Sequence, residues 1–182
     1  MSSAAKVAIA VGHHEDAPGA ALSVGRHTIH EHGLWKPFAY RLQDVVQCGK
    51  PAIHARVFER PAPNAFQDVA GEVNAYNPDA CIELHHNAST NPAATGTEMV
   101  TPSDSDASRT LAKHLQAKTV RAVGLPDRGI KTVDVSILPH VRAPSVVVEP
   151  GFGSNEGDAW TVVTHLPAIM DAYAKGLCEY IF

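Results

Sequence analysis

Hydrophobic residues fall along the chain in two patterns, and the first is a set of short apolar runs. Such runs, bounded by polar or turn-forming residues, predict buried β-strands. Five segments fit this description: Lys6–Val11, Ile53–Phe58, Ala80–Leu84, Glu98–Thr101 and Ser145–Glu149. Since they are short and spread over the whole chain, they indicate a single sheet.

The second pattern is a repeat of three or four positions, which is typical of amphipathic helices with one apolar face. It occurs between the first two strands, at Phe38, Leu42, Val45 and Val46, in a helix that we expect to start near Trp35. It occurs again at Phe66, Val69, Ala70 and Val73. The spacing of Asn64 and Gln67 resembles a capping box at the start of this second helix, and Asn77-Pro78 marks its end.

Two further helical segments follow in the second half of the chain. One is predicted from about Ser105 to Val123, with Gly124 suited to its C-terminal cap. The other runs from Glu156 to Phe182, where Pro167 is expected to break it or to begin a second segment.

Strands that alternate with helices predict an α/β fold of three layers. We expect a single sheet of about six strands, mostly parallel or mixed, with helices on both of its faces. The chain has 182 residues and shows no internal repeat, low-complexity tract or long Pro/Ser linker. Residues 1–182 are therefore expected to form one domain.

Composition narrows the class of protein without naming a function. The chain is 45% hydrophobic and 19% charged, values typical of globular proteins rather than disordered or fibrous ones. Its net charge of -4 gives no basic footprint, so nucleic acid is not an expected partner. No apolar run approaches the roughly 18 residues of a membrane span. Residues Met1–Ala10 lead directly into the first strand without a secretory apolar region, so we expect synthesis in the cytoplasm without a signal peptide.

Histidines form three clusters that point to metal chemistry: Gly12-His13-His14-Glu15, His30-Glu31-His32 and Leu84-His85-His86-Asn87. The first and third directly follow predicted strands, and ligands gather at strand ends in open α/β sheets. His13 and His85 are therefore expected on one rim of the sheet. Two imidazoles and one carboxylate, with a fourth position left for water, form a common catalytic zinc set, and Glu31 can supply the carboxylate.

A histidine beside a strand end is, taken alone, more often a structural residue than a ligand. The three clusters together favour the metal site. Because successive strand residues point to opposite faces, only one histidine of each pair is expected to face the metal. His14 and His86 are then left to support the ligands, to face the substrate or to be exposed.

Glu149 ends the buried run that begins at Ser145. Burial disfavours an ionised carboxylate and a nearby cation favours it, so the pKa of Glu149 is open to tuning for proton transfer. The alternative is a structural role in capping the turn that follows. Other catalytic signatures are missing from the sequence, namely the His-Glu-x-x-His zinc motif and the Gly-x-Ser-x-Gly context of a serine nucleophile.

Taken in order, these segments resemble the zinc-dependent N-acetylmuramoyl-L-alanine amidases, a family of bacterial division and sporulation enzymes and phage endolysins. The matching segments are Val7–His13 with Pro18-Gly19-Ala20, His30-Glu31, Leu84–Ala88, Gly96-Thr97-Glu98 and Ala143–Asn155. The resemblance implies hydrolysis of the amide bond between N-acetylmuramic acid and L-alanine in peptidoglycan. It implies one Zn²⁺ per chain on His13, Glu31 and His85, with Glu149 as the catalytic glutamate. Asn87 or His86 is a candidate for binding substrate.

The chain departs from the family around the first ligand. Where the family has Gly-Gly after this histidine and Asp three residues before it, the chain has His14, Glu15 and Ala10. A backbone carbonyl or Asp16 is expected to replace that Asp in orienting His13. The departures leave two alternatives open: a related zinc amidohydrolase acting on a small N-acyl amino acid, and a wall-binding or activating module without catalysis.

The resemblance also bears on regulation and organisation. Division amidases of the family carry an occluding helix between the third motif and the catalytic glutamate, and we find no room for one between His85 and Glu149. We therefore expect constitutive activity without an activator, as in a phage or prophage endolysin that reaches the cell wall on release. No separate cell-wall-binding module is expected, and the chain is assumed to be a monomer.

Overall fold

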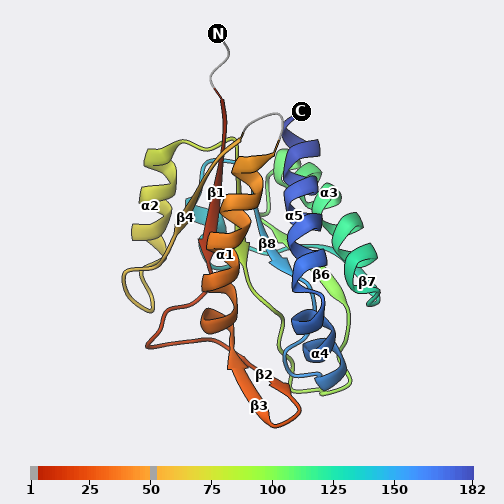
Figure 1. Cartoon of the computed structure of the whole chain (residues 1–182). Helices are drawn as coiled ribbons and strands as arrows, with labels where there is room; N and C mark the ends of the chain where they lie inside the picture. Colours follow the sequence, from red (N-terminus) through yellow and green to blue (C-terminus); the bar gives the residue numbers. More distant parts are fainter. Residues whose placement is uncertain (1–3, 50–52) are drawn as a thin grey trace.

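The computed structural model describes residues 4–49 and 53–182 and is built around a six-stranded sheet. The strands lie in the order β4-β1-β5-β8-β6-β7 (Figure 1). Their bounds are β1 (Ala5–Val11), β4 (Ile53–Phe58), β5 (Ala80–Leu84), β6 (Thr97–Thr101), β7 (Asp127–Thr132) and β8 (Ser145–Glu149). Neighbouring strands are parallel except β6 and β8, which are antiparallel. The sheet is therefore mixed, and the predicted fold class is confirmed.

Helices cover both faces of this sheet. They are α1 (Glu31–Cys48), α2 (Phe66–Tyr76), α3 (Asp106–Val123), α4 (Glu156–Thr164) and α5 (Leu166–Ile181), with a 3₁₀ turn η1 (Leu138–His140). Residues of α1, α3, α4 and α5 share one apolar core with Val7, Ile9 and Val11 of β1. Residues of α2 pack on the other face, against Ala8 and Ala10. In the described part of the chain, no helix is both long enough and apolar enough to cross a membrane.

Helix boundaries agree with the predicted stop signals better than with the start signals. Asn77 and Gly124 adopt the left-handed conformation at the C-caps of α2 and α3, and Pro167 lies in the first turn of α5. The capping-box prediction for α2 is wrong, because Ala65 is the N-cap and no side chain caps the helix. α1 begins at Glu31 rather than near Trp35.

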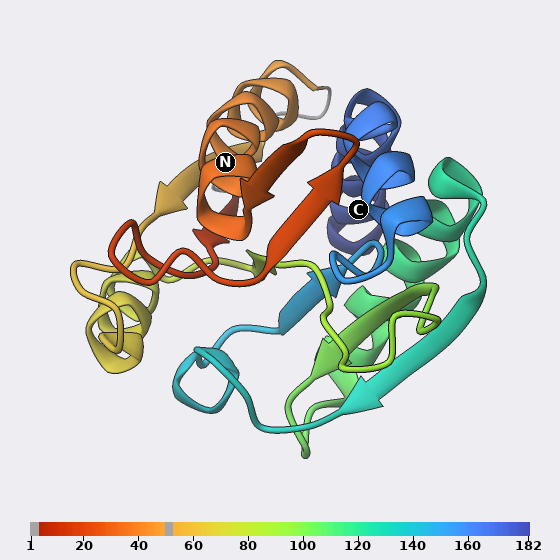
Figure 2. The same ribbon diagram turned by 90° about the horizontal axis from the view of Figure 1, so that it is seen from below.

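The sequence patterns did not reveal three strands, namely the two strands of a hairpin and the edge strand β7. β2 (Ala21–Val24) and β3 (His27–His30) form a short antiparallel hairpin that runs directly into α1 (Figure 2). The edge strand β7 is largely polar and exposed, so it lacks the apolar run by which buried strands are found. The hairpin matters for the site, because it places Glu31, the first residue of α1, near the carboxyl ends of β1 and β5.

Candidate metal centre

His13 lies just beyond β1, where a local backbone conformation turns it toward the neighbouring strand. Its φ angle is 66°, which is uncommon for a residue with a side chain. Two glycines make room for this arrangement: a Cβ atom on Gly19 would come within 2.6 Å of the His13 ring, and one on Gly12 within 2.7 Å of the His85 ring. Gly12 of the Gly-His segment and Gly19 of the Pro-Gly-Ala segment are thus both needed because any side chain there would collide with a candidate ligand ring.

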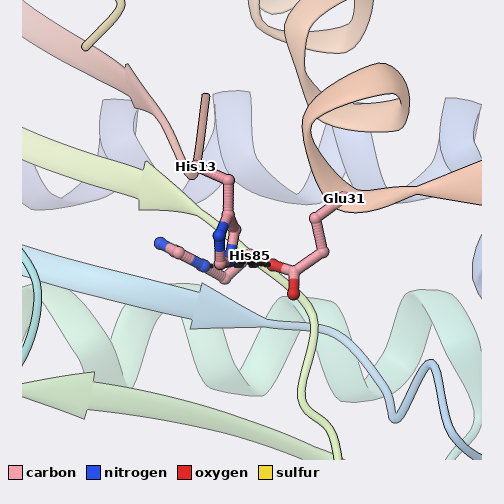
Figure 3. A group of neighbouring side chains, drawn as sticks. All are labelled: His13, Glu31 and His85. Atoms are coloured by element: carbon pink, nitrogen blue, oxygen red, sulfur yellow. Dashed lines mark hydrogen bonds and ion pairs between the residues drawn. The ribbon is translucent and has the colours of Figure 1, made fainter. Parts of the chain in front are cut away.

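Glu31, the first residue of α1, is buried, and its carboxylate points toward the rings of both histidines (Figure 3). Its Oε2 atom is 3.1 Å from His13 Nε2 and 3.1 Å from His85 Nδ1. The backbone amides of Ala20 and His86 donate to Oε1 and Oε2, over 3.0 and 3.3 Å. These contacts hold the carboxylate of Glu31 against both imidazoles.

The three side chains suit a zinc ion. One ligand atom from each of His13, Glu31 and His85 lies within 4.8 Å of the other two, and this is the only such group found in residues 4–49 and 53–182. Tetrahedral zinc with bonds of about 2.1 Å needs its ligand atoms roughly 3.4 Å apart. A set of three protein ligands leaves one position open, as catalytic zinc sites do.

The charges at the site favour a bound cation. Burial alone would raise the pKa of Glu31, but the hydrogen bonds with His13 and His85 outweigh it and hold the pKa well below its ordinary value. Burial opposes a charged His85, yet the negative charges of Glu83 and Glu31 raise its pKa to about 10. The raised pKa of His85 means that metal binding would compete with protonation of its ring.

Glu149 lies at the end of β8, next to β5 in the sheet. The amide of His85 donates to the carbonyl of Val148 over 3.1 Å, which brings His85 beside the end of β8. Burial raises the pKa of Glu149 to about 7, against the attraction of His85 and with added repulsion from Glu31. Its Oε2 atom is buried without a hydrogen-bond partner in the described chain, which disfavours the alternative role of capping the turn.

Asn87 connects the loop after β5 to the loop after β8. Its side-chain amide donates to Glu98 Oε1 over 2.6 Å, and its side-chain oxygen accepts from the amide of Ala88 over 2.8 Å. Its backbone pairs with that of Gly151 and Gly153. A role in binding substrate stays a prediction, since both ends of the side chain already have partners within the protein.

The histidines next to the candidate ligands have different environments. The ring of His14 turns to Asp16, with His14 Nδ1 3.5 Å from Asp16 Oδ2. The expectation that Asp16 orients His13 is wrong, because the Asp16 carboxylate lies against His14 instead. The alternative, that a backbone carbonyl orients His13, stays a prediction. His86 is buried behind Glu31, its Nε2 3.9 Å from Glu31 Oε1, and burial lowers its pKa to about 4.

Sequence reasoning missed two buried charged residues next to His85. Glu83 lies within β5 and forms an ion pair with Arg60, which follows β4, over 2.6 Å. Burial opposes the charge on Glu83, but the positive charges of His85 and Arg60 lower its pKa to about 2. The available signal was a lone glutamate inside the apolar run Ala-Cys-Ile-Glu-Leu, since a charge in a buried strand needs a partner.

A mixed α/β sheet with two histidines and a glutamate converging at the ends of adjacent strands defines a domain with a candidate catalytic metal centre. The particular family follows from comparison with known sequences. The chain belongs to the N-acetylmuramoyl-L-alanine amidase family, whose sequence profile matches residues 7–179.

Solved structures with a similar fold include N-acetylmuramoyl-L-alanine amidases. The N-acetylmuramoyl-L-alanine amidase from Clostridium difficile 630 is similar with a TM-score of 0.87 and 23% identity, covering 99% of this chain and 98% of that one. The catalytic domain of CwlV from Bacillus (Paenibacillus) polymyxa var. colistinus has a TM-score of 0.84 and 21% identity, covering 97% and 98%. At such identities the likeness supports the fold alone.

Among curated sequences, the N-acetylmuramoyl-L-alanine amidase LytC of Bacillus subtilis (strain 168) is 29% identical over 97 residues. The match covers 52% of this chain and 20% of LytC. The matched region spans less than half the length of the curated relatives.

Proposed function

We propose that this protein is a zinc-dependent amidase that cleaves the bond between N-acetylmuramic acid and L-alanine in peptidoglycan. The observation that carries the proposal is the shared contact of Glu31 Oε2 with one ring nitrogen of His13 and one of His85, at 3.1 Å each. Membership of the amidase family supplies the substrate class.

The proposed chemistry is hydrolysis of an amide. Held by His13, Glu31 and His85, zinc would supply Lewis acidity that activates water and polarises the scissile carbonyl. Glu149 takes a proton from the attacking water and returns it to the nitrogen of the leaving L-alanine. In the metal-free chain, burial raises the pKa of Glu149, which favours a carboxyl able to hold a proton between the two steps.

The direct test is mass spectrometry of purified peptidoglycan after digestion with zinc-loaded protein. We expect free stem peptides that begin with L-alanine and glycan strands that remain long. The protein treated with a chelator should release none, and the Glu149→Gln variant should release them about 10²- to 10⁴-fold more slowly. Cleavage within the glycan or within the stem peptide would contradict the proposal.

A second candidate is a zinc amidohydrolase acting on a small N-acyl amino acid. It is favoured by His14 and Glu15, which place two side chains where the family has Gly-Gly beside the first ligand. Muropeptides and N-acyl glutamate can be digested side by side. Faster turnover of N-acyl glutamate would favour this candidate over the wall amidase.

We further propose that activity at the cell wall needs no activator protein. Between His85 and Glu149 the structure has one α-helix, α3, which packs against α5, and the 3₁₀ turn η1. The packing of α3 against α5 supports the expectation that no helix of this stretch occludes the candidate metal centre. Full activity of the purified chain on isolated walls is expected, and a strict requirement for an added protein would refute the proposal. A phage or prophage origin and a monomeric state stay predictions.

A further inference from the structure

A buried charged cluster lies beside His85, on the side of its ring away from Glu31. Glu83 Oε1 accepts hydrogen bonds from Arg60 Nη2 over 2.6 Å and from Ser136 Oγ over 2.8 Å. The same oxygen is 3.4 Å from His85 Nε2, an ion-pair distance. Three groups from different parts of the fold thus converge on one carboxylate oxygen.

Each member of this cluster is held in place independently of the candidate metal. Glu83 is 1% exposed and Arg60 is 6% exposed. The guanidinium of Arg60 lies over the Phe66 ring, 4.3 Å from its centroid, and also donates to Ser136 Oγ over 2.7 Å. Ser136 has a φ angle of 53°, a conformation that non-glycine residues keep only where their surroundings enforce it. The carboxylate of Glu83 is therefore preorganised.

Stability alone gives a poor reason for this arrangement. A buried ion pair is often no more stabilising than apolar side chains of the same size, because both charges lose their water. The surroundings on this face are apolar, with Ala8, Ala10 and Cys81 in the same core. An interaction of Glu83 with the neighbouring His85 explains why the buried charges are present.

His85 has two ring nitrogens with different neighbours. Nδ1 faces Glu31 Oε2, while Nε2 is buried and has no hydrogen-bond partner within the described chain. A carboxylate near the second nitrogen of a ligand histidine fixes its tautomer and ring orientation. With the proton on Nε2 facing Glu83, the lone pair of Nδ1 is left for the metal.

We propose that Glu83, held by Arg60 and Ser136, is a positioning residue of the metal centre that keeps the proton of His85 on Nε2 and presents Nδ1 to zinc. This inference rests on the proposed zinc site. It assigns a role to residues outside the ligand set and makes the affinity for zinc depend on a cluster that touches neither metal nor substrate.

The test is the zinc affinity of the full chain, measured at one pH by competition with a chromophoric chelator. Glu83→Gln alone would leave Arg60 buried without its partner, so the main variant is the double substitution Arg60→Met/Glu83→Gln, which removes both charges. We expect it to fold and to bind zinc roughly 10- to 100-fold more weakly than the unmodified chain.

A matched control separates positioning from general loss of stability. Leu115 is fully buried in α3 and packs against Gly176 of α5, so Leu115→Ala should destabilise the protein without touching the site. It should keep the zinc affinity of the unmodified chain. Equal affinity in the double variant and the unmodified chain would overturn the inference, as would an equal loss in Leu115→Ala. Failure of the unmodified chain to bind zinc would instead refute the proposed function itself.

Discussion

Ala10 on β1 and Glu83 on β5 are register partners across adjacent parallel strands. Position 10 is where the family resemblance leads one to expect an aspartate, three residues before the first ligand. In this chain the carboxylate stands instead on the neighbouring strand, where it binds Arg60 and approaches His85. The negative charge at this level of the sheet is thus present, but it comes from a different strand.

This relationship predicts that a carboxylate at position 10 can partly replace the carboxylate of Glu83. Glu83→Ala should lower the free energy of unfolding by about 3–5 kcal/mol, because it leaves Arg60 buried and unpaired. Adding Ala10→Asp should restore part of that loss, since the new carboxylate starts from the paired position. Urea unfolding of both variants checks this. A double variant no more stable than Glu83→Ala would show that position 10 cannot serve Arg60.

His85→Ala is expected to lose zinc, because it removes one of three candidate ligands. The matched control is His14→Ala, which removes a histidine that turns to Asp16 and away from the candidate site. Metal analysis of the purified proteins should find about one zinc per chain in the control and almost none in His85→Ala. Stoichiometric zinc in both would remove His85 from the ligand set.

Glu149→Gln is expected to keep the fold and the zinc but to lose turnover. Glutamine is nearly the same size, yet it cannot accept the proton of water, and loss of a general base typically slows a reaction about 10²- to 10⁴-fold. Rates of stem-peptide release and metal content should be measured on the same preparation. If the variant loses zinc, Glu149 is a ligand and the assignment of Glu31 must be reconsidered.

The raised pKa of Glu149 predicts a pH dependence of stability in the metal-free protein. Its pKa is about 7 when folded and near 4.5 for an ordinary glutamate, so between these values the folded state binds more protons than the unfolded state. The contribution of Glu149 to stability therefore falls as pH rises from about 4.5 to 7.

The measurement is chelator-treated protein unfolded in urea at pH 5 and pH 8. Glu149→Gln has no proton to release, so relative to the unmodified chain it should gain stability at pH 8, by on the order of a few kcal/mol. At pH 5 the two proteins should differ little. An equal difference at both pH values would mean that Glu149 does not titrate in this range.

Local patterns in the sequence were enough to predict the layers of the fold and most of its buried strands. Apolar runs located β1, β5 and β8, whose residues are almost all buried, while β4 and β6 were found from shorter apolar stretches between polar residues. The edge strand β7 and the hairpin of β2 and β3 escaped, since short or exposed strands lack that pattern. In the described chain β2 and β3 pair only with each other, and β7 is held at the edge of the sheet by β6, so none of the three shows the apolar run of a buried central strand.

His13 and His85 were found because polar residues that directly follow apolar strands stand out in the sequence, and Glu31 because it lies in a third cluster of histidines. That His13, Glu31 and His85 converge, and that His86 is buried while His14 turns to Asp16, was decided by the tertiary structure. The cluster of Glu83, Arg60 and Ser136 was decided there too. Its members come from β5, the end of β4 and the loop before η1, and a buried charge finds its partners through space, where no sequence spacing records them.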